Sequence, residues 1–272
     1  INLDGTAGVG PSDNRGVYLQ DAGTIIQSTN GDISITGTGA GGGTNSVGLM
    51  NNGARIISTG TAKISLVGTS VGEGGSGVFL DSNAIVQSTN GDISGTGTGS
   101  GLANSYGVWL NNGASVISTG SAAITLVVTG ASVNAGIFDS TGSPNVIGGP
   151  SATGPISLTA LANGISLSSV TTGGAGSGNI LIKAADASPI VIGSGGSVNA
   201  GSSVLTLSLA GGTANDNNNP ITAGALRLLG TGTFNLGGSG NNVGTLAANV
   251  TGSVSHRNIG GLTIGSVTSF DG

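Results

Sequence analysis

The 272-residue chain contains no cysteine, and only 6% of its residues are charged. The absence of cysteine excludes disulfide bonds and thiolate metal sites. Six Lys and Arg residues and a formal net charge of −5 argue against binding to nucleic acid or to an anionic membrane surface, because both depend on basic side chains. No apolar run approaches the ~18 residues of a membrane-spanning helix, so we expect no membrane insertion.

The sequence also lacks helical periodicity, and its commonest residues are those of turns and strands. Glycine supplies 56 residues, while hydrophobic residues make up 36% and the mean hydropathy is +0.30. Disordered chains are charged and poor in Val, Ile and Leu, which is the reverse of this composition. Glycine at turns with β-branched residues between them predicts an all-β protein of many short strands.

Two blocks of sequence occur twice at the same interval. Residues 27–34 (QSTNGDIS) recur unchanged at 87–94, and residues 51–54 (NNGA) recur at 111–114. Both halves of this unit fit one template, so the basic period is about 30 residues, which is typical of a solenoid. We predict a parallel β-helix with about 30 residues per coil in its N-terminal half, right-handed by the crossover rule for parallel strands.

Each coil is expected to hold three strands. Glycines open the regular coils, and each is followed by an apolar strand: Gly16, Gly48, Gly77, Gly107 and Gly136. A turn rich in Asn and Gly comes next, as at residues 51–53, because these residues accept a left-handed backbone. A later strand alternates, which points Ile33 and Ile35 inward and Ser34 outward.

The coils should form one shaft with two parts of different regularity. Residues 1–143 hold the regular coils with the double repeat, and residues 144–272 continue the same shaft with more irregular coils. Residues 216–220 (DNNNP) are the most loop-like stretch and are expected to bulge from it. Residues 1–4 do not resemble a secretory leader, and the pattern starts and stops without a polar cap, so we expect a segment of a longer protein.

Stacking would place the second residue after each opening glycine in one column. The members of this column are Tyr18, Met50, Phe79, Trp109 and Phe138. If Val78 and Leu80 point inward, the column points outward. Three interpretations stay open: an interface with another shaft, a platform on which glycan rings stack, or a column that is covered by a glycine-rich loop or buried in the core.

A second column holds charged residues that precede the third strand of successive coils, namely Asp32, Lys63 and Asp92. Opposite charges on adjacent coils would lie about 5 Å apart. Exposed pairs of this kind support a fold by only about a few tenths of a kcal/mol each. Because Lys63 separates the two carboxylates, we interpret the column as a structural charge ladder.

Motifs of catalysis and metal binding are missing. Acid–base catalysis needs carboxylates clustered on neighbouring coils, but the eleven Asp and Glu residues are scattered, and His256 is the only histidine. We therefore predict no enzyme, no cofactor and no metal site. The hydroxyl column Thr29, Thr59, Thr89 and Thr119 leaves ice binding as a remote alternative, although such hydroxyls also fit a turn by bonding neighbouring backbone.

The C-terminal third resembles a known family in its motifs. The resemblance lies in residues 226–230 (LRLLG), 241–247 (NNVGTLA) and 261–267 (GLTIGSV). They resemble the β-strand repeats of filamentous-haemagglutinin-like exoproteins, which are large bacterial surface or secreted proteins. Members of that family form right-handed β-helices and are often exported by two-partner secretion. The resemblance implies the same fold and an extracellular or bacterial cell-surface location.

These observations predict a structural function. We expect a non-catalytic extracellular rod that builds a surface filament, a fibre or a long adhesin shaft. Its partners would be copies of itself or the rest of a longer polypeptide, because the open end of a β-helix is a template for further strands. The alternative is a glycan-binding adhesion module that uses the column from Tyr18 to Phe138.

Overall fold

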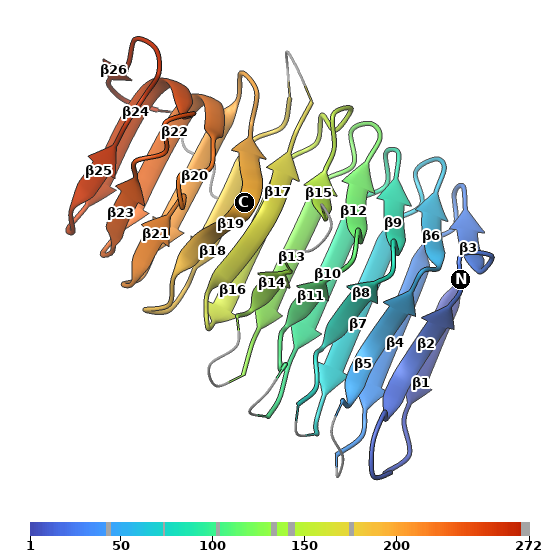
Figure 1. The fold of residues 1–272 in the computed structure, drawn as a ribbon. Helices are drawn as coiled ribbons and strands as arrows, with labels where there is room; N and C mark the ends of the chain where they lie inside the picture. Colours follow the sequence, from blue (N-terminus) through green and yellow to red (C-terminus); the bar gives the residue numbers. More distant parts are fainter. Residues whose placement is uncertain are drawn as a thin grey trace.

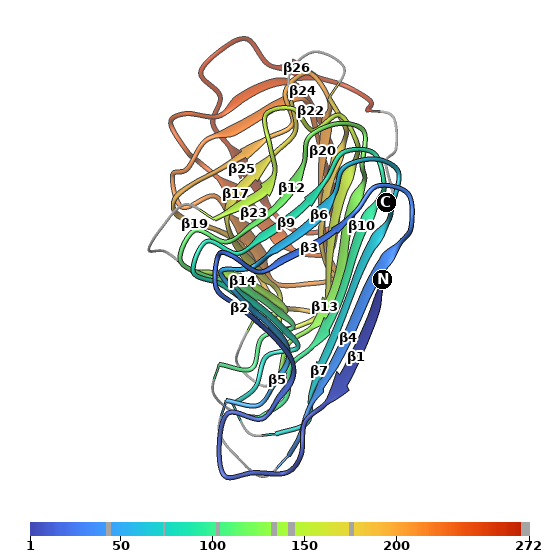
Figure 2. The same ribbon diagram turned by 90° about the vertical axis from the view of Figure 1, so that its right-hand side faces the viewer.

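The chain folds into a continuous stack of β-coils. The computed structural model describes residues 1–41, 45–72, 74–101, 104–131, 135–140, 145–173 and 177–267. These residues form 26 strands and no helix (Figure 1). The described residues therefore contain no helix that could span a membrane. The pairings between these strands are parallel, and the strands wind around one axis (Figure 2). The prediction of an all-β parallel β-helix is confirmed, while its right-handedness stays a prediction.

Three ladders of strands run along the stack. The first ladder contains β1 (Asn2–Thr6), β4 (Ile33–Gly39), β7 (Ile64–Ser70), β10 (Ile93–Thr98), β13 (Ile124–Thr129), β16 (Ile156–Ala162), β18 (Ile180–Ala184), β20 (Val204–Leu209), β22 (Ile221–Gly230), β24 (Asn242–Val250) and β26 (Thr263–Ile264).

The second ladder contains β2 (Arg15–Gln20), β5 (Val47–Asn52), β8 (Val78–Asp81), β11 (Val108–Leu110), β14 (Ile137–Asp139), the starts of β17 (Ile165–Thr171) and β19 (Ile190–Asn199), β21 (Thr213–Asn215), β23 (Thr233–Leu236) and β25 (Val254–His256). The third ladder contains β3 (Ile25–Ser28), β6 (Arg55–Ser58), β9 (Ile85–Ser88), β12 (Ser115–Ser118), β15 (Val146–Gly148), the ends of β17 and β19, and the starts of β22 and β24.

The coils shorten along the stack. Ser34 pairs with Ser65 and Thr206 with Arg227, so the stretch of sequence between paired residues becomes shorter toward the C-terminus. The predicted period of about 30 residues is confirmed for the N-terminal coils. Most of the loss lies between the first and second ladders, where residues 7–14 connect β1 to β2 but only residues 231–232 connect β22 to β23. The proposed boundary at residue 143 falls outside the described residues, and β13 pairs with β16 across that region.

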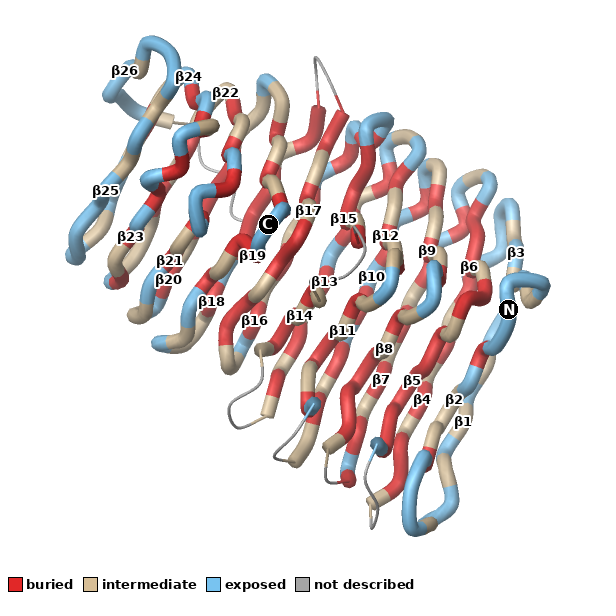
Figure 3. Tube along the Cα trace, in the orientation of Figure 1, coloured by how far each residue is buried: buried red, intermediate tan, exposed pale blue. Residues whose placement is uncertain are grey.

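Alternation along the strands builds the core. Ile33 and Ile35 are fully buried and Ser34 lies on the outer side, as predicted. Equivalent positions of successive coils stack in register, for example Ile33 with Ile64 and Ile64 with Ile93, so the interior is a set of apolar columns. Buried residues accordingly recur from coil to coil along the stack (Figure 3).

The opening glycines are required by a close approach of two backbones. A Cβ built on Gly48 would lie 2.3 Å from the amide nitrogen of Thr69, and one built on Gly37 would lie 2.0 Å from the carbonyl oxygen of Gly48. Such distances exclude a side chain. We call this contact the glycine seam, and its members are Gly5, Gly37, Gly68 and Gly97 on the first ladder and Gly16, Gly48, Gly77, Gly107 and Gly136 on the second. Beyond the seam, described residues of the long connections, such as 7–14, 45–46 and 104–106, project from the coils, and we call them the flange (Figure 2).

The two NNGA blocks do not occupy equivalent positions. Asn51 pairs with Leu19 and Leu80 and therefore occupies a core position of β5. The backbone amide of Asn111 donates to the carbonyl of Leu80, so the second NNGA block starts one position later in its coil than the first. The predicted turn at Asn51 is therefore wrong, and the backbone turns at Gly53. The side-chain amide of Asn51 is buried in the core without a hydrogen-bond partner among the described residues.

Residues 216–220 do not bulge from the shaft. The carboxylate of Asp216 is buried and accepts hydrogen bonds from the Gly238 amide at 2.8 Å and from Asn241 Nδ2 at 2.9 Å. Asn219 is also buried, and its Nδ2 donates to the carbonyl of Gly193 at 2.8 Å. The polar side chains that suggested a loop instead replace the strand hydrogen bonds that are lost at a tight corner between coils.

Substitution of Gly48 by alanine tests the glycine seam. The new methyl group would meet backbone atoms of two neighbouring coils, which cannot move without breaking ladder hydrogen bonds. We expect Gly48→Ala to lower the free energy of unfolding by about 3 kcal/mol, measured by urea denaturation. Gly23→Ala is the matched control, because nothing lies within 4 Å of that position, and it should change stability by less than about 0.5 kcal/mol. Equal effects of the two substitutions would contradict the seam.

Substitution of Asn51 by leucine tests the buried amide. Leucine restores the residue type of the paired positions Leu19 and Leu80 and removes two unpaired polar atoms. The free energy of unfolding should rise by about 1–3 kcal/mol. The reverse change, Leu80→Asn, should lower it by a similar amount or more. A variant Asn51→Leu that is less stable than the wild type would show that the amide has a partner in solution.

Candidate functional site

The column of large side chains predicted from the sequence lies on the outside of the second ladder. Tyr18 pairs with Met50, Met50 with Phe79, Phe79 with Trp109, and Trp109 with Phe138. Val78 and Leu80, on either side of Phe79, are buried, so the column points away from the core. We call these five residues the aromatic file.

Part of the aromatic file is covered by the flange. The Phe79 and Trp109 rings stack with centroids 4.3 Å apart, and Tyr106 from the flange stacks on Phe138 at 4.4 Å and lies 5.0 Å from Trp109. Burial raises the pKa of Tyr106. Met50 is only 9% exposed. The file thus points outward, as predicted, and flange residues cover part of it; whether it serves as an interface or a glycan platform stays a prediction.

In the first four coils, one residue stands directly before the second-ladder seam glycine, and two of these residues, Arg15 and Tyr106, pack on rings of the aromatic file. Arg15 pairs with Val47, and the hydrogen bonds from Gly48 to Ser76 and from Gly77 to Tyr106 continue the same register. We call these residues the cover file: Arg15, Val47, Ser76 and Tyr106. Each lies three positions before a member of the aromatic file. The sequence analysis missed Tyr106, although its place before Gly107 could have indicated it.

A third set of residues forms the outer wall. Two positions before each cover residue, the backbone adopts a left-handed conformation, with φ of 55° at Asp13, 62° at Asn45, 70° at Gly74 and 53° at Asn104. Asn, Asp and Gly are the residues that tolerate this conformation. We call these four residues the rim file. Repetition of the same backbone geometry in four coils gives the flange a regular wall.

The three files enclose a pocket of about 240 Å³. Met50, Phe79 and Trp109 form its floor, while the whole rim file and the cover residues Arg15, Val47 and Ser76 form its walls. In the two coils between those of Arg15 and Tyr106, the cover positions hold the smaller side chains of Val47 and Ser76.

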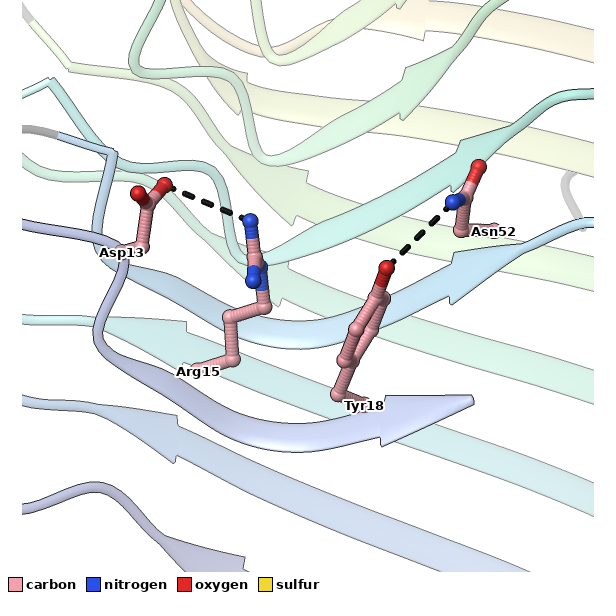
Figure 4. Close-up of polar contacts among 4 residues, drawn as sticks. All are labelled: Asp13, Arg15, Tyr18 and Asn52. Atoms are coloured by element: carbon pink, nitrogen blue, oxygen red, sulfur yellow. Dashed lines mark hydrogen bonds and ion pairs between the residues drawn. The ribbon is translucent and has the colours of Figure 1, made fainter. Parts of the chain in front are cut away.

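The Arg15 side of the pocket is held by polar contacts (Figure 4). Arg15 Nη2 donates to Asp13 Oδ1 at 3.3 Å, and the guanidinium carbon lies 4.6 Å from the centre of the Tyr18 ring. Asn52 Nδ2 donates to the Tyr18 hydroxyl at 3.3 Å. An exposed ion pair of this kind contributes about 0–1 kcal/mol, so its main effect is to fix the position of Arg15 and to balance its charge.

The predicted charge column is in register, but its carboxylates bind backbone. Asp32 Oδ1 accepts the Lys63 amide at 2.9 Å, and Asp92 Oδ1 accepts the Ala123 amide at 3.0 Å. Within the described residues the only salt bridge is Asp13–Arg15, so Lys63 makes none with Asp32 or Asp92. The contribution of this column comes from hydrogen bonds between coils rather than from alternating charge.

The described part of the chain holds no group of three or more His, Cys, Asp or Glu residues that could bind a metal ion. Burial raises the pKa of Asp139, partly offset by hydrogen bonds from Asn145 and Ser168. Burial also lowers the pKa of His256, partly offset by the side chain of Asn258 and the charge of Asp216. That the protein is not an enzyme stays a prediction.

Hydroxyl columns lie on two faces of the stack. In the predicted column, Thr29 Oγ1 bonds Thr59 Oγ1 at 2.9 Å and Thr89 Oγ1 bonds Thr119 Oγ1 at 3.3 Å, as expected for local support. The sequence analysis missed a wider array on the outer side of the first ladder. Its three files are Ser34, Ser65, Ser94 and Thr125, then Thr36, Val67, Thr96 and Val127, then Thr38, Thr69, Thr98 and Thr129. The ice-binding alternative would have to use this array.

Two substitutions distinguish charge from hydrogen bonding in the Asp32–Lys63–Asp92 column. Asp92→Ala removes the acceptor for the Ala123 amide and should lower the free energy of unfolding by about 1 kcal/mol. Lys63→Gln removes the charge but keeps the backbone amide that bonds Asp32, so it should change stability by less than about 0.5 kcal/mol. Urea denaturation at low and high salt measures both effects. A larger loss of unfolding free energy for Lys63→Gln than for Asp92→Ala would show that charge, rather than hydrogen bonding, is the main contribution of this column.

Neither a family model, nor a curated protein, nor a solved structure matches the chain. The resemblance to filamentous-haemagglutinin-like repeats therefore stays a prediction from the sequence.

Proposed function

We propose that the chain is a non-catalytic segment of an extracellular β-helical rod, which forms part of a surface filament or a long adhesin shaft. One observation carries this proposal: parallel ladders run from β1 to β26 without interruption and end in strands whose outer edges pair with no described residue. The extracellular location is supported by the sequence resemblance alone.

The open edge is well defined at β1. The Ala7 amide donates to Thr38 O at 2.9 Å and the Ser34 amide donates to Ile1 O at 2.8 Å. Because alternate peptide groups of a parallel strand face opposite sides, those of Asn2, Asp4 and Thr6 face away from β4. Unpaired peptide groups of this kind are a template for another strand.

The coils at both ends of the stack contain more exposed residues than those in the middle (Figure 3). Ile1 in the first coil is 52% exposed, and Ile264 in β26 is 73% exposed. Equivalent core positions in the middle of the stack are fully buried. Another coil on either end would cover these side chains and the strand edges together.

The change in coil length favours a continuous shaft over head-to-tail stacking of identical chains. Asn2 pairs with Ser34 at one end of the stack and Thr222 pairs with Asn242 near the other, so the first coil is much longer than the last ones. Stacked copies would place a long coil with its flange against a short coil without one. Coils added by the same polypeptide can instead match each end in size.

Electron microscopy of the native material tests the proposal. An antibody raised against this chain should label rods in negative stain, and the labelled polypeptide should be heavier than the 25.5 kDa of these residues. Fibres that dissociate into 25.5 kDa chains would support a filament of stacked subunits and contradict the continuous shaft. Labelled compact particles without any rod would contradict both forms of the proposal.

A further inference from the structure

We propose that Asn30 and Gly31 form a site of spontaneous covalent modification, at which Asn30 loses its side-chain amide and becomes aspartate or isoaspartate. The pair Asn90–Gly91 lies in an identical octapeptide, but the stack protects it. This property goes beyond the structural role of the rod, and neither depends on the other.

The reaction is an attack within the chain. The backbone nitrogen of Gly31 bonds to Cγ of Asn30, the bond from Cγ to Nδ2 breaks, and the amide proton of Gly31 leaves with that nitrogen as ammonia. Water then opens the resulting cyclic imide at one of its two carbonyls, which gives aspartate or isoaspartate. Glycine favours the attack, because it has no Cβ to obstruct the approach.

The first copy of the repeated octapeptide leaves both reacting groups free. Asn30 and Gly31 are exposed, and the nearest atom to a Cβ built on Gly31 is Ser28 Oγ at 3.6 Å. Neither the backbone amide of Gly31 nor the side chain of Asn30 makes a hydrogen bond with a described residue. The nitrogen and the carbon that must meet are therefore not held apart by other contacts.

In the second copy, the same two groups are bonded to neighbouring coils. The Gly91 amide donates to the carbonyl of Gly60 at 3.2 Å, and Asn90 Oδ1 accepts a hydrogen bond from Ser121 Oγ at 3.1 Å. Gly91 is also buried, and a Cβ there would lie 1.9 Å from the carbonyl oxygen of Ala62. Reaction at Asn90 requires these contacts to open first, which costs free energy.

The remaining three Asn–Gly pairs of the chain are held as well. Each has a hydrogen bond on one of its two reacting groups: the Gly53 amide to the Asp81 carbonyl at 3.0 Å, Asn112 Nδ2 to Asp81 Oδ1 at 2.9 Å, and Asn163 Nδ2 to the Gly130 carbonyl at 2.9 Å. Among the five Asn–Gly pairs, all of which the structure describes, only Asn30–Gly31 has both groups free.

The protection depends on position in the stack. Gly60, whose carbonyl holds the Gly91 amide, belongs to the preceding coil. No described strand lies before the first coil, in which β1 pairs only with β4 and β3 only with β6. A preceding coil that continued the repeat would cover Gly31 in the same way. Modification of Asn30 therefore marks an open end of the stack.

Peptide mass spectrometry measures both sites in one sample. Trypsin cleaves after Arg15, Arg55 and Lys63, so Asn30 and Asn90 lie in different peptides. The 272-residue chain is incubated at mildly alkaline pH, either folded in buffer or unfolded in guanidinium chloride. In the folded chain Asn30 should deamidate at least tenfold faster than Asn90, a factor that corresponds to about 1.4 kcal/mol of local opening. In the unfolded chain the two rates should be equal, because the surrounding octapeptides are the same.

Two variants connect the rates to the contacts. Ser121→Ala removes the hydrogen bond to Asn90 Oδ1 and should speed deamidation of Asn90 several-fold, while Asn30 keeps its rate. Thr61→Ala is the matched control, because Thr61 holds the place of Ser121 in the coil after Asn30 but makes no hydrogen bond to it, so both rates should stay unchanged. Circular dichroism and thermal unfolding establish that each variant is folded.

Two results would overturn the proposal. The first is a rate at Asn30 in the folded chain that does not exceed the rate at Asn90. The second is an Asn30 that stays intact in the folded chain while both copies deamidate in the unfolded chain. Neither result bears on the rod, which is tested by microscopy.

Discussion

The glycine seam determines how each N-terminal coil is divided. Where two backbones meet without side chains between them, the interior of the coil closes, and the chain beyond that point must form a separate flange. The flange carries the rim and cover files over the aromatic file. On the first ladder the seam ends after Gly97, because the next two coils have Val128 and Ala160 at the paired position. Their side chains hold the two backbones apart. From there the connection between the first two ladders shortens to residues 163–164, between β16 and β17.

Parallel stacking turns single residues into columns, about 4.8 Å apart from coil to coil. A column of like side chains supports the stack, as the carboxylate-to-amide hydrogen bonds of Asp32 and Asp92 do. A column in which one member differs creates a local feature. The replacement of larger side chains by Gly74 and Ser76 produces the pocket between Arg15 and Tyr106. A lateral pocket in such a rod thus arises where the members of a column differ rather than where they repeat.

The sequence predicted what depends on period alone. Inward and outward phase followed from alternation at Ile33–Ile35, and the aromatic file followed from the spacing of the seam glycines. It did not predict features that depend on register by one residue or on contacts between ladders. Asn51 shares its tetrapeptide with Asn111 but pairs with Leu80, because the coil is one residue shorter before its turn. The sequence around Asp216 is typical of a solvent-exposed loop. It does not reveal that the carboxylate accepts a hydrogen bond from Gly238 in the next coil.

The N-terminal and C-terminal halves of the stack share the same three ladders but connect their strands differently. In the N-terminal coils, three short strands are separated by turns, and the long connection can vary without disturbing pairing. In the C-terminal coils, β22 and β24 pass from the third ladder into the first as single strands of 10 and 9 residues. This continuity leaves little room for a flange, and Asn side chains bond the backbone at the corner instead, as Asn241 does with the Ile221 amide at 2.8 Å. Elongation needs only the ladders, whereas the pocket over Phe79 also needs the flange, which accompanies the glycine seam.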